Sequence, residues 1–361
     1  MSIIMSAGEA SGDRLGGALA AELRRRRPDL HIAGIGKEAM QNAGVEIIAP
    51  SDALSVVGHW DVLGRLPKIL ALRRRFLAEI RRRQPRLFIG IDAPDFNLGV
   101  AAKARGWGIK TAQYVSPSVW MWRGGRTEKI SRAADEIWCL FPFEPAAYSG
   151  SGAQARFVGH PDAARAVDKT EARRKLQTAP DEKLIALLPG SRDSELRMHL
   201  PLFAEVMRAM PGRRFIAAAA DENAAAQIRA ALPGAQTHAG MAEDILAAAD
   251  IALVKCGTAV LQAALAQTPA AAVYVLPRMA YFLASRREFR LPFFSLPNIL
   301  SERFVVPEFI QSEARAPEIA KYLTRLLEDE QLCAAQLDAF AVLRKQLISE
   351  QSAADAALEM L

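Results

Sequence analysis

The sequence has few cysteines, and their spacing argues against two kinds of stabilised architecture. The chain of 361 residues contains three, Cys139, Cys256 and Cys333, an odd number with no C-x-x-C pair. Neither a disulfide framework nor a zinc site is expected, and a reducing compartment fits. The five histidines also lack the spacing of metal ligands, so no metal is expected.

Long apolar segments and a leader are missing as well. No stretch of about 18 apolar residues occurs, because the best candidate, residues 263–276, is interrupted at 267–269 by Gln-Thr-Pro. The first five residues carry no basic charge, so no signal peptide is expected. A protein of this kind does not span a membrane but is able to lie on one.

What is present suits a folded protein with two cores. Hydrophobic residues make up 51% of the chain and charged residues 24%, and the length favours two domains. The formal net charge is +6. This basic excess favours anionic partners, namely phosphorylated substrates, acidic lipids or nucleic acid, without choosing among them.

Short apolar runs alternate with amphipathic stretches, which is typical of parallel sheets. The strands expected in the first half are residues 2–6, 31–36, 87–91, 111–115 and 136–140; those in the second half are 184–188, 215–219, 251–254 and 271–275. We predict an α/β fold of two doubly wound domains facing across a cleft. The domains are residues 1–163 and 164–340, and a C-terminal helix in 341–361 packs back on the first. Ligands in such folds bind at the carboxyl ends of the strands.

Two loops of the first half follow apolar strands. Residues 7–13, Ala-Gly-Glu-Ala-Ser-Gly-Asp, let backbone amides approach an anion at a helix start, or form only a tight turn capped by Asp13. No G-x-G-x-x-G fingerprint occurs at a strand-to-helix turn, so no dinucleotide cofactor is expected. Residues 91–97 place Asp92 at the cleft edge as a candidate general base, whereas Asp95 suits a helix cap.

Two loops of the second half suit phosphate. The amides of Gly190 and Ser191 begin a helix, and Arg192 is able to fork onto phosphate oxygens. The other loop, residues 255–258 with the sequence Lys-Cys-Gly-Thr, follows the expected strand at 251–254 and also begins a helix. It contains Gly257 and Thr258, and Gln262 lies one turn on. Together with Asp92 these loops predict a diphosphate leaving group opposite the base that activates a nucleophile.

Three further features have a functional and a structural interpretation. Trp120 and Trp122 form either an acceptor-side wall or a packed loop, and His160 lies at the interdomain crossing. Residues 56–76 include Val57, Trp60 and Leu63, which have no obvious burial site and are flanked by arginine and lysine. Such a pattern suits an anionic lipid surface, or else a solvated basic helix over a core face formed by residues such as Leu70 and Phe76.

These loops, in this order, resemble the lipid A disaccharide synthases, inverting glycosyltransferases of the GT-B fold. The matching strings are residues 7–13, 91–97, 114–123, 157–161, 187–192, 296–300 and 306–311, which run through nearly the whole chain. The resemblance implies transfer of 2,3-diacylglucosamine from its UDP donor to 2,3-diacylglucosamine 1-phosphate. The products are the β-1,6-linked lipid A disaccharide 1-phosphate and UDP. It also implies a peripheral location on the cytoplasmic face of the inner membrane and no nucleic-acid partner.

The resemblance also implies roles for individual residues. Asp92 is the suspected base, Glu9 is also implicated, and Arg192 and Asn298 belong to the donor side. Ser11, in the same loop as Glu9, is expected on the acceptor side. Two departures concern the donor side. Cys256 and Gln262 stand where the family usually has serine and glutamate, and Val275 follows Tyr274 where it usually has arginine. These departures allow one alternative, a non-catalytic nucleotide- or lipid-binding protein. A second alternative, a UDP-sugar 2-epimerase, stays open because it shares the GT-B architecture.

Overall fold

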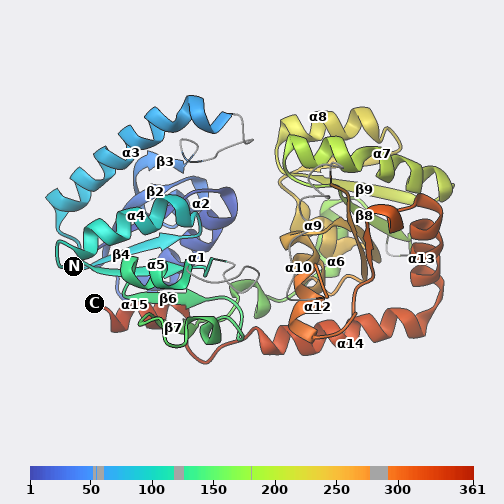
Figure 1. Ribbon diagram of the computed structural model, residues 1–361. Helices are drawn as coiled ribbons and strands as arrows, with labels where there is room; N and C mark the ends of the chain where they lie inside the picture. Colours follow the sequence, from blue (N-terminus) through green and yellow to red (C-terminus); the bar gives the residue numbers. More distant parts are fainter. Residues whose placement is uncertain (52–53, 55–60, 118–125, 180, 277–291) are drawn as a thin grey trace. The chain divides into compact units, whose positions relative to one another are not determined.

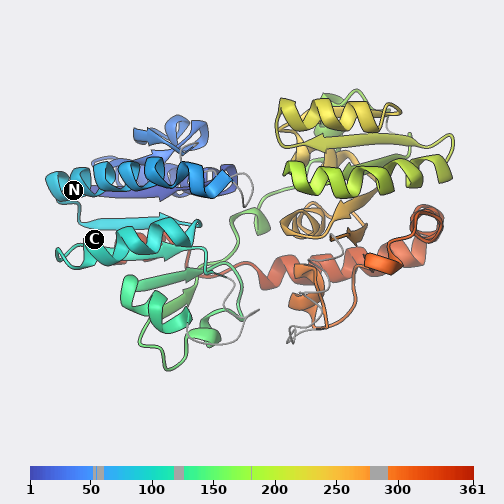
Figure 2. The same cartoon turned by 45° about the horizontal axis from the view of Figure 1, so that its top comes forward.

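The computed structural model describes residues 1–51, 54, 61–117, 126–179, 181–276 and 292–361 (Figures 1 and 2). The chain divides into two compact units. Unit 1 comprises Met1–Ala163 and Gln346–Leu361, and unit 2 comprises Ala164–Lys345. No helix in these described ranges has the length and apolar character needed to cross a membrane.

Unit 1 contains a seven-stranded parallel sheet in the order β3-β2-β1-β4-β5-β6-β7. The order reverses between β1 and β4, which is the switch point where open α/β sheets bind ligands. The strands are β1 (Ser2–Ala7), β2 (His31–Gly36), β3 (Glu46–Pro50), β4 (Leu87–Ile91), β5 (Lys110–Tyr114), β6 (Glu136–Cys139) and β7 (Gln154–Phe157).

Helices cover the sheet of unit 1. They are α1 (Ala10–Arg26), α2 (Glu38–Asn42), α3 (Asp61–Arg83), α4 (Pro94–Arg105) and α5 (Arg126–Ala133). Phe76 of α3 packs edge-on against Phe88 of β4, with ring centroids 6.3 Å apart. Leu70 was expected on the same core face, but it is 47% exposed, because it lies about 120° around the helix from Phe76.

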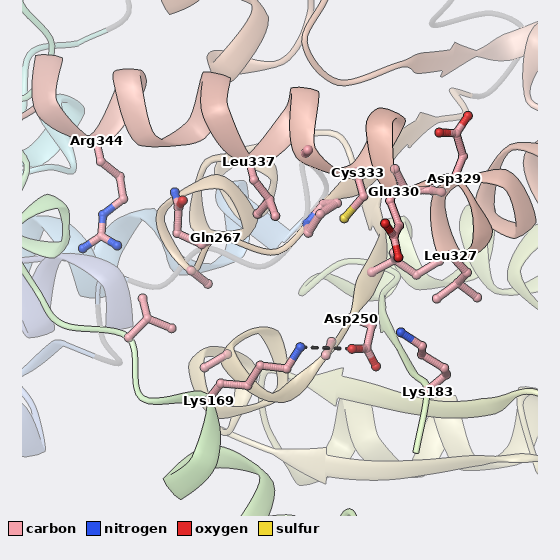
Figure 3. Close-up of a pocket in the computed structure, with 18 residues that line it drawn as sticks. Lys169, Lys183, Asp250, Gln267, Leu327, Asp329, Glu330, Cys333, Leu337 and Arg344 are labelled. Atoms are coloured by element: carbon pink, nitrogen blue, oxygen red, sulfur yellow. Dashed lines mark hydrogen bonds and ion pairs between the residues drawn. The ribbon is translucent and has the colours of Figure 1, made fainter. Parts of the chain in front are cut away.

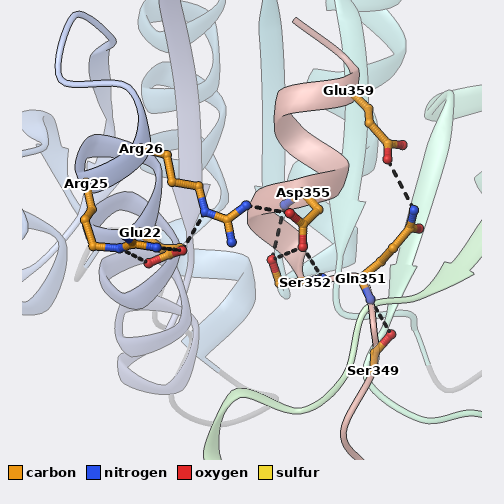
Figure 4. A network of polar contacts seen from close by, with 8 residues as sticks. All are labelled: Glu22, Arg25, Arg26, Ser349, Gln351, Ser352, Asp355 and Glu359. Carbon is orange, nitrogen blue, oxygen red and sulfur yellow. Dashed lines mark hydrogen bonds and ion pairs between the residues drawn. The ribbon is translucent and has the colours of Figure 1, made fainter.

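The C-terminal segment belongs to unit 1 (Figure 4). Ser352 caps α15 (Ala353–Glu359) by accepting the Asp355 amide, and the Arg26 guanidinium of α1 donates to the Asp355 carboxylate. Just before this helix, the carbonyl of Leu347 accepts the backbone N–H of His160 at 2.8 Å. The last residues of the chain therefore pack beside its first helix.

Unit 2 repeats the same strand order in a six-stranded parallel sheet, β10-β9-β8-β11-β12-β13. Its strands are β8 (Leu184–Leu188), β9 (Arg214–Ala219), β10 (Ala235–Ala239), β11 (Ile251–Lys255), β12 (Ala270–Tyr274) and β13 (Glu308–Ile310). Its helices are α6 (Lys169–Lys175), α7 (Asp193–Ala209), α8 (Glu222–Ala231), α9 (Ala242–Ala248), α10 (Thr258–Leu265), α12 (Leu296–Ser301), α13 (Ala316–Glu328) and α14 (Glu330–Gln346). In both views α7 and α8 lie side by side over the sheet (Figures 1 and 2). The switch point lies between β8 and β11, and the predicted α/β class with two parallel sheets is confirmed.

Candidate active site

The switch point of unit 1 brings two predicted loops together. Ala7 at the end of β1 pairs with Ile91 at the end of β4. A Cβ added to Gly8 would lie 2.5 Å from the Cβ of Ala93, so only glycine fits at this close approach. Glu9, which is exposed, and Asp92, which is half-buried, therefore belong to adjoining loops at one edge of the sheet.

The backbone at Asp92 is strained and held by buried amides. Asp92 and Ala93 both have positive φ angles, 51° and 42°, a region that non-glycine residues rarely adopt. The carbonyl of Asp92 accepts hydrogen bonds from the side-chain amides of Asn97, at 2.8 Å, and Gln113, at 3.0 Å. The Asp92 amide donates to the carbonyl of Tyr114 at 2.9 Å. Neither amide side chain was predicted, although a glutamine inside an apolar strand was a signal for such a role.

Two predicted caps are corrected by the structure. Asp13 is buried and accepts the backbone amides of Lys37 and Ala39, so it caps α2 and not its own helix, which begins earlier than expected. Asp95 makes no cap either, because the N-cap of α4 is Ala93 in a left-handed conformation with no side-chain hydrogen bond. Ser11 is exposed in the first turn of α1.

His160 follows β7 at the carboxyl edge of the same sheet. Its ring stacks on Phe141, with centroids 6.4 Å apart, and its Nδ1 accepts the Asp162 amide at 3.3 Å. Burial lowers the pKa of His160 below its ordinary value, despite the nearby Asp162 carboxylate, so the ring is neutral near pH 7. Four predicted residues, Val57, Trp60, Trp120 and Trp122, lie outside the described residues, as does the side chain of Leu63.

The switch point of unit 2 joins the two predicted phosphate loops. Leu188 at the end of β8 pairs with Val254 of β11, so the turns that follow both strands adjoin. Gly190 has a φ of 127°, which favours glycine, and a Cβ there would lie 2.7 Å from that of Glu195. Ser191, Arg192 and Thr258 are exposed at the starts of α7 and α10.

A charged cluster that was not predicted lies between these loops. Glu195, in the first turn of α7, accepts the Ser191 amide at 3.0 Å and the ammonium of Lys255 at 2.9 Å. Burial opposes ionisation of Glu195, but Lys255 and the Ser191 amide hold the pKa of its carboxyl below the usual range. Any phosphate at the Ser191 amide must therefore share or replace this carboxylate. Lys255 belongs to the predicted loop that follows the expected strand at 251–254, whereas Glu195 had no signal in the sequence.

The other predicted donor residues differ in accessibility. Gln262 is half-buried in α10, and the side chain of Cys256 is buried, which raises its thiol pKa to about 12. Asn298 is fully buried. Its amide donates to the carbonyl of Val306 and the carboxylate of Glu308, and its oxygen accepts two backbone amides. In this conformation Asn298 fixes the segment before β13.

A cavity of about 560 Å³ in unit 2 lies away from these loops (Figure 3). Its lining includes Lys183, Asp250 and Pro269, which precede β8, β11 and β12. The cavity is therefore at the amino ends of the strands, whereas ligands of open parallel sheets bind at the carboxyl ends. We do not assign it to the site. Within the described ranges, no three His, Cys, Asp or Glu residues cluster as a metal site.

Solved structures share this architecture. The glycosyltransferase of kitacinnamycin aligns with a TM-score of 0.64 at 13% identity, covering 100% of this chain and 99% of that chain. The UDP-GlcNAc 2-epimerase from Neisseria meningitidis aligns with a TM-score of 0.64 at 9% identity, covering 96% and 99%. At such identities the likeness concerns the fold alone, and it defines the chain as a GT-B protein.

The sequence comparisons are more specific. A family model described as "Lipid-A-disaccharide synthetase" matches residues 3–360. The lipid-A-disaccharide synthase of Dechloromonas aromatica is 39% identical over 376 aligned residues, covering 99% of this chain and 98% of that protein. The one from Azotobacter vinelandii is 38% identical, covering 99% and 97%. The chain belongs to the lipid-A-disaccharide synthase family and is a glycosyltransferase. Neither the epimerase nor the non-catalytic alternative is favoured.

Proposed function

We propose that the chain forms the lipid A disaccharide 1-phosphate from UDP-2,3-diacylglucosamine and 2,3-diacylglucosamine 1-phosphate, with Asp92 as general base. The observation that carries the proposal is which chemical groups lie at the switch point of each unit. Unit 1 has a carboxylate on a strained, clamped backbone at its switch point, whereas unit 2 has amides, Arg192 and a lysine. A base and an anion site are the two things that an inverting transfer from a nucleotide sugar requires.

The chemical step is a single displacement. The acceptor hydroxyl loses its proton to the Asp92 carboxylate and forms a bond to the anomeric carbon of the donor. The bond between that carbon and the diphosphate oxygen breaks, and UDP leaves with the electron pair. The charge that develops on the diphosphate is stabilised by Arg192 and the loop amides. Glu9 lies in the loop after β1, which adjoins the loop after β4 that contains the proposed base.

Acceptor-dependent release of UDP tests the reaction. Wild-type protein is incubated with the UDP donor, with and without acylated acceptor, and both UDP and disaccharide are measured. We expect UDP and disaccharide in equal amounts only when acceptor is present. Isomerisation of the sugar without UDP release would instead indicate an epimerase, and the absence of either product would indicate a binding protein.

We also propose that unit 1 contacts an anionic membrane surface near the start of α3. Support comes from the described part of this helix, where Leu70 is 47% exposed. Arg74, one turn further on, is exposed on the same face, and Lys68 and Arg75 are exposed elsewhere on the helix. Apolar groups among cations suit the interface of anionic lipid. Arg73 contributes less, because its guanidinium packs against Gly99 of α4.

Vesicle sedimentation tests this contact. Replacing Val57, Trp60 and Leu63 together by serine should reduce sedimentation with anionic vesicles and leave the melting temperature almost unchanged. Phe304→Ser, which changes an apolar residue of unit 2 that is 64% exposed, is the matched control. A large drop in the melting temperature of the triple variant would place these residues in the core and contradict the proposal.

A further inference from the structure

The carboxylate of Glu195 is surrounded by groups that bind anions. One oxygen accepts the amides of Ser191 and Arg192, at 3.0 and 3.4 Å, and the other accepts the Lys255 ammonium at 2.9 Å. The guanidinium of Arg192 lies 4.0 Å from that second oxygen. Two amides and two cations around one pair of oxygens are the donor set that binds a phosphate at a helix start.

Lys255 lies at the centre of this donor set. It is the last residue of β11, next to β8 at the switch point. Its ammonium is 3.4 Å from the position of a Cβ on Gly257, which precedes α10, and it bonds to Glu195 in the first turn of α7. The charge therefore lies between the starts of two helices. Only 15% of its side chain is exposed, and the ammonium lies 5.2 Å from the centre of the Tyr274 ring.

We propose that Lys255 is a further donor-binding residue, whose ammonium contacts the diphosphate of the UDP-sugar. The proposal rests on the donor site described above. In the structure Lys255 is paired with Glu195, and Glu195 also bonds to the Ser191 amide that the diphosphate would use. When the diphosphate binds, it takes the place of the Glu195 carboxylate beside the Lys255 ammonium, so Lys255 needs to move little. A lysine serves phosphate as a point charge, which complements the forked guanidinium of Arg192.

The competing interpretation is that Lys255 only neutralises Glu195. A series of ligands separates the two roles, because uridine has no phosphate, UMP has one and UDP has two. We expect Lys255→Met to weaken UDP binding by about ten- to a hundredfold, the range for a lost charge-assisted bond, and to change uridine binding less than about twofold. Lys175→Met is the control, because this lysine pairs with Asp244 on the exposed surface of the same unit. It should leave all three affinities unchanged in calorimetry.

The double variant Glu195→Gln/Lys255→Met decides between the roles. If Lys255 only neutralises Glu195, Lys255→Met weakens UDP binding because it leaves an unpaired carboxylate in the site. Replacing Glu195 by glutamine removes that carboxylate and restores the affinity for UDP. If Lys255 contacts the diphosphate, UDP binding stays weak in the double variant. Restored affinity, or a Lys255→Met variant that binds UDP as wild type does, would overturn the inference and leave the donor site in place. A folded wild-type protein that does not bind UDP would overturn both.

Discussion

Asp92 has a backbone conformation that its side chain makes unfavourable. Positive φ angles at two successive non-glycine residues cost about 1–3 kcal/mol each and persist only where the surroundings fix them. Here the side-chain amides of Asn97 and Gln113 fix the Asp92 carbonyl from two sides. The strain falls on the proposed base, so the fold positions this carboxylate before any acceptor binds.

Asp92→Asn tests the base directly. The amide keeps the size of the side chain but is unable to take a proton, so we expect turnover to fall by about two to four orders of magnitude with the melting temperature unchanged. Asp95→Asn is the control, since Asp95 is exposed in the first turn of α4. An Asp92→Asn protein with more than about a third of wild-type turnover would remove Asp92 from the mechanism.

Asn97→Leu tests whether positioning of the base matters. Asn97 is fully buried, and its amide donates to the carbonyls of Ser6, Ile91 and Asp92. Its loss removes one donor from each of these carbonyls and leaves the Asp92 carbonyl to Gln113, which should cost about 1–3 kcal/mol of stability. We expect kcat to fall and the donor KM to stay the same. Because Asn97 acts through Asp92, the variant Asp92→Asn/Asn97→Leu should turn over as Asp92→Asn does, and a multiplied loss would contradict this role.

Gln262→Glu tests the sharpest departure from the family pattern. A carboxylate one turn into α10 would accept hydrogen bonds from the ribose hydroxyls more strongly than an amide does, by about 1–2 kcal/mol. We expect the donor KM to fall several-fold with little change in kcat, as for restored uniform binding. An unchanged or higher KM would place the ribose elsewhere.

Single residues were predictable where they lie in the turn after an apolar strand. Asp92 directly follows the strand at 87–91, Lys255 directly follows the expected strand at 251–254, and Arg192 lies in the turn after β8; polar residues in these turns lie at the ligand-binding edge. Glu195 lacks this signal, since it lies inside a helix. The contact between Glu195 and Lys255 depends on the pairing of β8 with β11, two strands that are distant in the sequence. Sequence patterns do not encode such a contact.

At the scale of elements, the predicted and the missed strands differ in burial. The central strands β4 and β8 are buried along their whole length, and their apolar runs gave their exact bounds. The four strands that were missed, β3, β7, β10 and β13, are the edges of the two sheets and are largely half-buried or exposed. An edge strand needs no continuous apolar run, so the signal for a doubly covered strand is absent there.

His199 joins two elements of unit 2 and makes their contact sensitive to pH. Its Nδ1 bonds to the carbonyl of Glu195 in α7, and its Nε2 accepts the Val275 amide just after β12, at 3.0 Å. A proton on Nε2 would abolish the second bond. Burial lowers the pKa of His199 below 6.5, although the Glu195 carbonyl acts in the other direction, and the nearby Lys255 lowers it further.

The sign of the pH dependence follows from this lowered pKa. The unfolded chain takes up the proton at a higher pH than the folded protein does. The contribution of neutral His199 to the free energy of unfolding is therefore fully present above about pH 6.5 and is lost as pH falls towards the folded-state pKa. We expect the melting temperature of wild type to decline from pH 7 to pH 5 more steeply than that of His199→Gln. Equal slopes would show that His199 does not titrate between these states. His160, whose pKa is also lowered, should maintain some slope in both proteins.

At the scale of the whole molecule, both units have the same strand order and place their candidate groups at the switch point. The first and last parts of the chain belong to one unit, because residues 346–361 return to unit 1. All five tryptophans lie between residues 60 and 138, and therefore also in unit 1. Tryptophan fluorescence thus reports on unit 1, whereas far-ultraviolet circular dichroism reports on both.

Leu347→Ala uses this difference to test the return of the chain. Leu347 is fully buried, so truncation of its side chain should cost about 2–5 kcal/mol in unit 1, while the backbone hydrogen bond to the His160 amide is kept. Leu323→Ala in α13 is the matched control, a fully buried leucine in the core of unit 2. In urea we expect Leu347→Ala to lower the unfolding midpoint that fluorescence reports. Leu323→Ala should lower the unfolding midpoint of unit 2, which dichroism detects, and leave the fluorescence midpoint unchanged.

A Leu347→Ala variant with an unchanged fluorescence midpoint would mean that the C-terminal segment does not stabilise unit 1. Equal shifts of both signals in both variants would mean that the two units unfold together, in spite of their separate cores.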